Sequence, residues 1–297
     1  MESFSRGWSF LKQAWSMAFK DKDLLKPSIY ALFAGMILSL IGIIPIAIVA
    51  FLFSGSQFGN IVMGVLGAIM VFVQFVVTYV FSGMTAYLIF GYLSEGDGRM
   101  DKAWAIVRRD FFDILTLAAA STAVNLVKNA ANRNRRGVAS GVIRGVANLF
   151  EVLWTEVSYL ILPAMVIDDL NLKEGMQRVL NITKQNLLLI GISTVGVRWV
   201  TGLIGFLLGF GGFVIALAIG GGAVYASGGF NFLSIAAIAL AAFIFFMFIV
   251  VASVIGSYTS IAYHTCLYIW ARDVEKAQAA GQSFQVAAPA PLAAVLN

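Results

Sequence analysis

Two glutamates in a strongly apolar stretch are the residues of this chain whose type and place point to chemistry. The stretch reads LFEVLWTEVSYLILP, from Leu149 to Pro163, and it carries Glu151 and Glu156. An unpaired carboxylate inside a bilayer is costly, so such acids are candidates for ion or proton handling, or they are structural groups with a cationic partner. Five residues of an α-helix turn by about 500°, so the two side chains point about 140° apart and do not form one carboxylate pair.

Few other residues are available for chemistry. His264 is the only histidine and Cys266 the only cysteine, which excludes a multi-histidine metal site, an intrachain disulfide and a thiol cluster. No G-x-S-x-G, P-loop or H-E-x-x-H pattern occurs. We therefore expect no enzyme, no cofactor and no metal ion. Asp113 and Arg198 are further candidate polar sites, because both lie in apolar runs.

The composition indicates a membrane protein. Hydrophobic residues make up 60% of the chain and charged residues 12%, with a mean hydropathy of +0.88, whereas a soluble domain is about half apolar and a quarter charged. A helix of about 20 apolar residues spans a bilayer. Four longer runs occur, at residues 28–53, 61–93, 187–226 and 232–270. The first is too long for a cleaved signal, so we expect it to remain in the mature protein.

The basic residues indicate the topology. The connectors at residues 54–60 and 211–231 carry no charge, whereas Lys and Arg flank the other ends of the long runs. The positive-inside rule therefore predicts an integral protein of the cell (inner, cytoplasmic) membrane with both termini cytoplasmic. The net charge of +5 is explained by these flanking residues. Their expected partners are anionic lipid headgroups rather than nucleic acid.

The middle of the chain allows two topologies. Two shorter apolar runs, at residues 111–127 and 148–167, are separated by KNAANRNRRG and Arg144. If both cross the membrane, the protein has six spans and a basic outer loop. If neither crosses, they form a helical hairpin at the cytoplasmic side and four spans remain. We favour four, because the five basic residues from Lys128 to Arg144 are costly to translocate.

The predicted fold is thus an all-α integral membrane protein with four long transmembrane helices, a central cytoplasmic-side helical hairpin and an N-terminal amphipathic helix, with six spans as the alternative. A second amphipathic stretch, at residues 171–186, again leads into a pair of apolar runs. The chain is therefore a candidate for duplication, which in many transporters frames the transport path. The predicted regions are an interfacial helix (1–27), a transmembrane hairpin (28–93), a cytoplasmic-side amphipathic or re-entrant region (94–186), a second transmembrane hairpin (187–270) and a cytoplasmic tail (271–297).

The N-terminal helix is predicted from an aromatic stripe at three- and four-residue intervals, formed by Phe4, Trp8, Leu11, Trp15 and Phe19. This stripe either lies in the membrane interface or packs on the protein's own spans. The residues expected to contact lipid headgroups are Arg6, Lys12, Lys20, Arg133, Arg135 and Arg136. The tryptophans expected to anchor the protein at headgroup depth are Trp8, Trp15, Trp199 and Trp270.

Two details of the second hairpin remain open. Arg198 either snorkels at the cytoplasmic end of a span from about Trp199 to Val224, which we favour, or lies near the midplane of a span that begins at Leu187. The glycine-rich segment from Gly220 to Phe230 is either a turn or a re-entrant piece. Close helix packing is predicted at Gly191, Gly196, Gly202, Gly205, Gly209, Gly211 and Gly212.

Four segments carry a resemblance to a known family: FSRGW, KDKDLL, LWTEVSYLILPAMVIDD and GMQRVLNITKQN. They resemble an uncharacterised family of bacterial and archaeal polytopic membrane proteins, distantly similar to the membrane domain of some glycerophosphodiester phosphodiesterases. The resemblance implies a helical membrane bundle in which a Trp-containing helix ends at Pro163, before a cytoplasmic amphipathic helix. It implies no activity. The family usually has apolar or small residues where this chain has Glu151 and Glu156, so neither inherits a role.

Two functions follow as hypotheses. The first is a non-enzymatic oligomeric scaffold that organises the membrane, or a pore-forming assembly, with membrane lipids as partners. The tail at residues 277–297 is rich in Ala, Pro and Gln, and such a tail is ordinarily mobile. If it is ordered, a neighbouring subunit is its simplest partner, so we expect a homo-oligomer. The alternative is a small-solute transporter or permease that uses Glu151 or Glu156.

Overall fold

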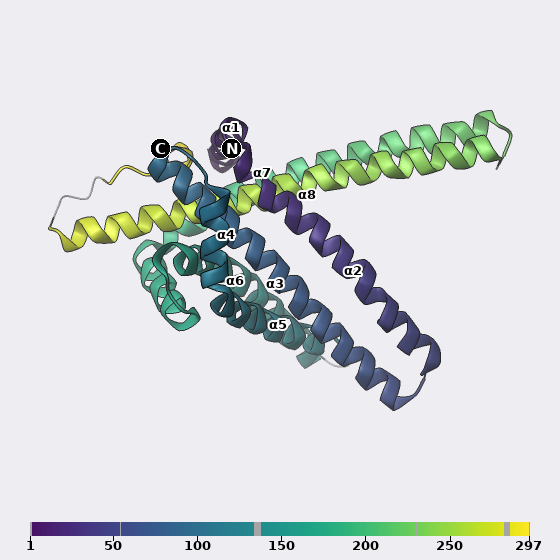
Figure 1. The fold of residues 1–297 in the computed structure, drawn as a ribbon, viewed down its shortest axis with the longest axis horizontal. Coiled ribbons are helices and arrows are strands. Elements are labelled where there is room, and N and C mark those ends of the chain that lie inside the picture. Colours follow the sequence, from purple (N-terminus) through teal and green to yellow (C-terminus); the bar gives the residue numbers. More distant parts are fainter. Residues whose placement is uncertain (1, 54, 134–137, 230, 282–285, 297) are drawn as a thin grey trace. The chain divides into compact units, whose positions relative to one another are not determined.

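The computed structural model is built from helices (Figure 1). It describes residues 2–53, 55–133, 138–229, 231–281 and 286–296; within these ranges the side chains of 2–3, 133, 138–143, 183–196, 279 and 294–296 lie outside the description. All secondary structure of the described residues is helical, which confirms the all-α prediction. The helices are α1 (Glu2–Lys20), α2 (Lys26–Leu52), α3 (Gln57–Glu95), α4 (Met100–Arg109), α5 (Phe111–Arg133), α6 (Val138–Asp168), α7 (Leu172–Ala226), α8 (Phe232–Ala279) and α9 (Ala290–Leu296), with a 3-10 turn at Lys22–Leu24.

Six helical segments of the described residues are long and apolar enough to cross a membrane: Lys22–Leu52, Gln57–Glu95, Phe111–Asn132, Arg144–Asp168, Val197–Ala226 and Phe232–Gln278. Large apolar side chains such as Leu40, Phe51, Phe206 and Phe243 are exposed on them, as on surfaces that face lipid. The protein is therefore a membrane protein with transmembrane helices. The favoured four-span arrangement is not confirmed, because the two central helices also meet the criteria of a span.

The helices divide into two compact units. Unit 2 comprises residues 21–187 and 264–289, and its central helix is α3, which packs against α2, α4, α5 and α6. In Figure 1, α5 and α6 lie alongside α3. The core of this unit forms where the second half of α3 meets α6. There Gly83 allows close approach, because a side chain at this position would meet Val166 at 3.2 Å.

Unit 1 comprises residues 1–20, 188–263 and 290–297. Helix α1 packs on α8: Phe10 meets the ring of Tyr263 edge-on at 5.5 Å, and the Tyr258 hydroxyl donates to the Ala14 carbonyl at 3.0 Å. Helix α9 packs against α1, and its Leu292 is fully buried. The ordered end of the tail therefore has a partner within its own chain. This removes the reason for expecting a neighbouring subunit there.

Helix α1 has two apolar faces rather than one. The packed face is formed by Phe10, Ala14, Met17 and Ala18, all buried. The predicted aromatic stripe lies about 110° away around the helix, and its Phe4, Trp8 and Phe19 remain exposed. Of the stripe itself, Trp15 packs on α8, with 5.6 Å between its ring centroid and that of Tyr258, whereas the exposed members stay available to the membrane.

Several predicted boundaries shift. The amphipathic stretch 171–186 and the following span form one helix, α7. The resemblance implied a helix end at Pro163, but α6 continues to Asp168; proline is tolerated inside membrane helices because neighbouring groups satisfy the freed carbonyl. Most of the glycine-rich segment belongs to α7, with a turn at residues 227–228 before α8; Phe230 itself lies outside the described residues.

Close helix packing at glycine is found at one described position of the predicted series. A side chain at Gly212 would meet Phe248 Cβ at 2.7 Å, so this glycine lets α7 approach α8. Gly202, Gly205, Gly209 and Gly211 have open space at the corresponding point. The surroundings of Gly191 and Gly196 lie outside the described residues.

Candidate functional site

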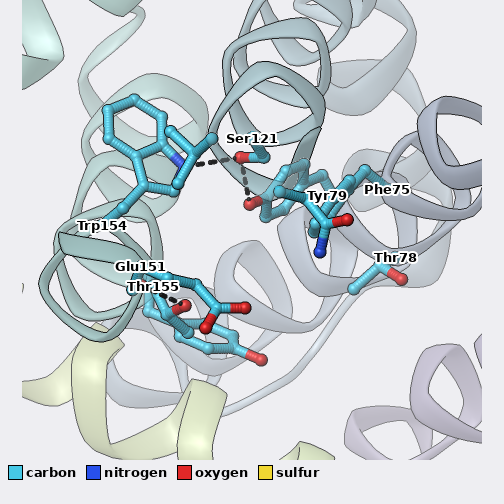
Figure 2. Close-up of a pocket in the computed structure, with 10 residues that line it drawn as sticks. Phe75, Thr78, Tyr79, Ser121, Glu151, Trp154 and Thr155 are labelled. Carbon is cyan, nitrogen blue, oxygen red and sulfur yellow. Dashed lines mark hydrogen bonds between the residues drawn. The ribbon is translucent and has the colours of Figure 1, made fainter. Parts of the chain in front are cut away.

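A cavity of about 80 Å³ with both polar and aromatic lining residues lies between α3, α5 and α6 of unit 2 (Figure 2). Each helix lines it with residues at positions i, i+3 and i+4, the spacing that brings side chains to one helix face. The lining residues are Phe75, Thr78 and Tyr79 of α3, Ser121, Val124 and Asn125 of α5, and Glu151, Trp154, Thr155 and Tyr159 of α6. Three apolar helices therefore turn polar faces toward one another.

Ser121 joins the three helices at one wall of the cavity. Its Oγ shares a hydrogen bond of 2.7 Å with the Tyr79 hydroxyl and accepts one of 2.8 Å from Trp154 Nε1. Figure 2 shows Ser121 between the two aromatic side chains. Tyr79 and Ser121 are both buried. Because a buried polar group without a partner is costly, this small network fixes how α3, α5 and α6 fit together.

Replacing Ser121 by alanine removes both of these hydrogen bonds at once. We expect it to lower the free energy of unfolding by about 1–3 kcal/mol, because it leaves the buried Tyr79 hydroxyl and the part-buried Trp154 N–H without this hydrogen-bond partner. Ser94→Ala is the matched control, since Ser94 is exposed and bonds only carbonyls of its own helix. Thermal unfolding in detergent measures the difference. Equal melting temperatures for the two variants would contradict the bridging role of Ser121.

Glu151 lines the cavity and forms an ion pair with Lys128 of α5. Lys128 Nζ lies 2.6 Å from Glu151 Oε2, and both side chains are about one-quarter to one-third exposed, at 29% and 27%. Lys128 is not among the lining residues. The Thr155 hydroxyl, one turn along α6, donates to the Glu151 carbonyl at 2.8 Å. Glu151 therefore presents a carboxylate between the cavity and a lysine outside it.

Glu156 has a different partner, His264 of α8. The distance between His264 Nε2 and Glu156 Oε2 is 3.1 Å, and only 4% of the His264 side chain is exposed. Tyr159 stacks on the imidazole with 5.2 Å between ring centroids and 23° between planes. Since Tyr159 also lines the cavity, this second pair lies behind the cavity wall. The two glutamates thus have separate partners, as the predicted angle between them requires.

A second set of ion pairs ties the ends of the unit 2 helices together. Asp168 accepts a short hydrogen bond from the Tyr268 hydroxyl and pairs with Arg272 at 3.0 Å. The Arg272 guanidinium also lies over the ring of Phe90, 5.3 Å from its centroid. These contacts hold the end of α6 against α8 and α3, away from the cavity-lining residues. They are structural in character.

Arg109 links the start of α5 to the turn after α6. It pairs with Asp110 at 2.6 Å and with Asp169 at 3.2 Å. Burial raises the pKa of Asp110 above its usual range, while the hydrogen bond from Arg109 pulls it the other way. Asp169 has a positive φ of 56°, a backbone conformation that asparagine and aspartate tolerate better than most residues.

Where the structure describes them, the other predicted polar and lipid-contacting residues are not among the residues that line the cavity. Asp113 lies in the first turn of α5, and Arg6, Lys12 and Lys20 are on α1 with partly or fully exposed side chains. The side chains of α7 that precede Val197, from residue 183, lie outside the described residues. The two predicted positions of Arg198, at the end of a span or near its midplane, are therefore both retained. The Arg133 side chain and all of Arg135 and Arg136 lie outside the described residues.

The four predicted tryptophan anchors fall into two kinds. Trp8 and Trp199 are 50% and 73% exposed, in keeping with headgroup contact. Trp15 instead donates to the Thr259 hydroxyl at 3.2 Å, and Trp270 donates to the Val286 carbonyl at 3.4 Å. The polar ends of these two indoles therefore bond within the protein.

Sequence reasoning found the two glutamates but missed the residues that surround them. Lys128 and His264 belong to other helices, so no helical spacing around Glu151 or Glu156 pointed to them. The i, i+3, i+4 spacing of Ser121 and Asn125 with Val124 was a readable signal for a polar helix face.

Comparison with known proteins yields no relative: no model of a known family matches the chain, and no curated protein matches it. The resemblance to polytopic membrane proteins therefore stays a prediction. The functional argument accordingly depends on the cavity and its ion pairs.

Proposed function

We propose that the protein is an integral membrane transporter for a small solute, and that its transport path passes through the cavity between α3, α5 and α6. The observation that carries this proposal is a cavity lined by aromatic rings, hydroxyl groups and the carboxylate of Glu151, among helices long and apolar enough to span a bilayer. Ionisable residues within membrane helices usually face a bundle interior or a water-filled path. Binding sites between such helices near the bilayer midplane are typical of transporters.

The depth of the cavity supports six spans. Tyr79 lies near the middle of the apolar run at residues 61–93, so it is close to the bilayer midplane when α3 spans the membrane. Ser121 and Trp154 are hydrogen-bonded at this point and share its depth. Glu151 is three residues from Trp154, which corresponds to about 4.5 Å along α6. On this basis α5 and α6 cross the membrane rather than lying on its surface.

Six crossings keep both termini on one side, which we propose to be the cytoplasmic side of the cell membrane. The basic residues of α1 and of the segment before α2 favour this orientation. The segment between α5 and α6 then faces the other side, against the positive-inside rule. Part of its charge is compensated, because Lys128 pairs with Glu151.

Cysteine accessibility tests this proposal without knowledge of the solute. The chain has a single native cysteine, Cys266, which is buried and provides a silent background. We expect Thr155→Cys, in the cavity wall, to react with a charged, water-soluble thiol reagent in protein reconstituted into lipid. Leu153→Cys is the matched control: Leu153 is 55% exposed on the protein surface but faces lipid in the proposed arrangement, so we expect it to be unreactive.

The two cysteine variants separate the possible outcomes. If neither reacts, the cavity is closed to the water-soluble reagent and the proposed open transport path is wrong. If both react equally, α6 lies in water and the six-span arrangement is wrong. A reaction at Thr155→Cys that is at least tenfold faster than at Leu153→Cys supports both proposals.

One observation favours membrane organisation as a second candidate function. The exposed aromatic face of α1, with Phe4, Trp8 and Phe19, lies on a helix that ends two residues before the first candidate span. An aromatic face next to basic residues suits the membrane interface beside anionic lipid. This face anchors or shapes the membrane in either role, so it supports a scaffold without excluding transport.

A further inference from the structure

We infer that the cavity binds a small ammonium-type cation, either ammonium itself or a short primary alkylammonium, on the carboxylate of Glu151. This inference rests on the proposed transport function, for which it supplies the class of solute. It is carried by four observations on the cavity: the charge of its wall, its aromatic content, the partner that Glu151 already has, and its size.

The wall of the cavity selects for positive charge. Among the ten residues that line it, Glu151 is the charged one, and none is Lys, Arg or His. The remaining polar groups are hydroxyls and the amide of Asn125, all of which have oxygen lone pairs that accept hydrogen bonds. The indole N–H of Trp154 already donates to Ser121. The wall therefore offers acceptors to a cation, and the one charged residue among those that line it is negative.

Aromatic side chains supply a second attraction for an ammonium group. Four of the ten lining residues are aromatic: Phe75, Tyr79, Trp154 and Tyr159. The rings of Phe75 and Tyr79 are stacked, with centroids 5.8 Å apart and planes at 15°. Aromatic rings attract ammonium ions through their negative faces, and the attraction grows when the site is shielded from water. This composition of carboxylate and rings is suited to an organic ammonium group.

Lys128 of the same chain already binds Glu151 through an ammonium group. Its Nζ, a primary alkylammonium, lies 2.6 Å from Glu151 Oε2. Glu151 is thus already placed to bind such a group, and an incoming cation of the same chemistry competes with Lys128 for it. The lysine ammonium is carried on a flexible four-carbon chain and is partly exposed. It can withdraw when the solute binds and return when the solute leaves, so the carboxylate keeps a counter-ion in hydrocarbon at both stages.

The size of the cavity limits the ligand. A cavity of about 80 Å³ has room for a few water-sized groups. Ammonium, methylammonium and ethylammonium are cations of this size. A desolvated alkali metal ion needs a full shell of oxygens. Four of the ten lining residues are aromatic, so much of the wall is ring carbon rather than oxygen.

Equilibrium binding of radiolabelled methylammonium to the purified protein in lipid nanodiscs tests the inference. We expect saturable binding that ethylammonium displaces and that equimolar sodium or potassium does not. Glu151→Gln should abolish binding, while Asp97→Asn, which removes an exposed acid outside the cavity, should leave it unchanged. Methylammonium binding that survives in Glu151→Gln, or equal displacement by sodium, would overturn the inference.

A second variant guards against a folding defect in the first. Lys128→Ala removes the competing ammonium from Glu151, so we expect it to bind methylammonium more tightly, on the order of tenfold. Lys173→Ala, an exposed lysine on α7, is the control and should have no effect. Weaker or unchanged binding in Lys128→Ala contradicts the competition. A gain of affinity is not produced by damage to the fold.

The test separates this inference from the transport proposal. If Thr155→Cys reacts but methylammonium does not bind, the proposal of a water-filled path is kept and the proposal of an ammonium solute is rejected. Saturable, Glu151-dependent binding combined with an unreactive Thr155→Cys supports the ammonium site and rejects the open transport path. The protein then has an ammonium site that is closed to the larger reagent, and the proposed path is wrong.

Discussion

Asp168→Ala is expected to lower the free energy of unfolding by about 3–5 kcal/mol, because it removes the closer of the two carboxylates that contact a largely buried guanidinium and also the acceptor of the Tyr268 hydroxyl. Only 12% of the Arg272 side chain is exposed, and Asp168 holds it at 3.0 Å while also accepting a hydrogen bond from Tyr268. The same change removes a contact between α6 and α8 within unit 2. Asp168→Asn should retain part of the stability, since the amide oxygen still accepts one hydrogen bond.

Asp273→Ala is the matched control for this prediction. Asp273 contacts the same arginine, at 3.4 Å from Nε, but its side chain is 42% exposed. An exposed ion pair contributes about 0–1 kcal/mol, so we expect a small effect. The buried thiol of Cys266 provides the measurement: a thiol-reactive fluorophore reports the temperature at which unfolding exposes it. A control variant as unstable as Asp168→Ala would show that burial does not distinguish the two contacts.

Glu156→Leu is expected to have the second largest effect, a loss of about 3 kcal/mol in the free energy of unfolding. His264 is almost fully buried, and the substitution removes the carboxylate that lies 3.1 Å from its Nε2. Loss of one partner of a buried polar pair costs the desolvation of the group left behind. The imidazole stacks on Tyr159, so we also expect the cavity wall to loosen.

Two further variants sharpen this result in the same unfolding assay. Glu156→Gln preserves size and a hydrogen-bonding oxygen, so a neutral His264 should tolerate it, while a protonated His264 should not. Glu151→Leu removes the more exposed of the two pairs, and we expect it to cost less than Glu156→Leu. Wild-type stability of Glu156→Leu would mean that the contact between Glu156 and His264 contributes nothing to the fold.

The sequence predicted the two acids of the candidate site but not their partners. Glu151 and Glu156 were found because acids in an apolar run are rare and costly, and their angle on the helix followed from its pitch alone. The partners were not found: Lys128 is on α5 and His264 is on α8. Helical spacing relates residues of one helix only, and it carries no information on which helix lies opposite.

At α1 and the tail, too, the sequence predicted local structure but not tertiary contacts. The aromatic repeat correctly indicated an amphipathic helix, because periodicity is a local property of the chain. The face that packs on α8 was missed, because Ala14 and Ala18 are too small to mark it in a hydrophobic pattern. The tail gave no hint that Leu292 is buried or that α9 packs on α1.

The sequence by itself determined the medium and the local structure of this protein: hydrocarbon as its solvent, helices as its elements, and two acids directed to different sides of one helix. Each of these depends on composition or on the geometry of a single helix. Only the tertiary structure decided which helices are neighbours, and hence that polar faces of α3, α5 and α6 enclose a cavity beside Glu151. In lipid there is no hydrophobic drive between helices, so their pairing depends on close fit and a few hydrogen bonds, such as those of Ser121, which a linear pattern does not reveal.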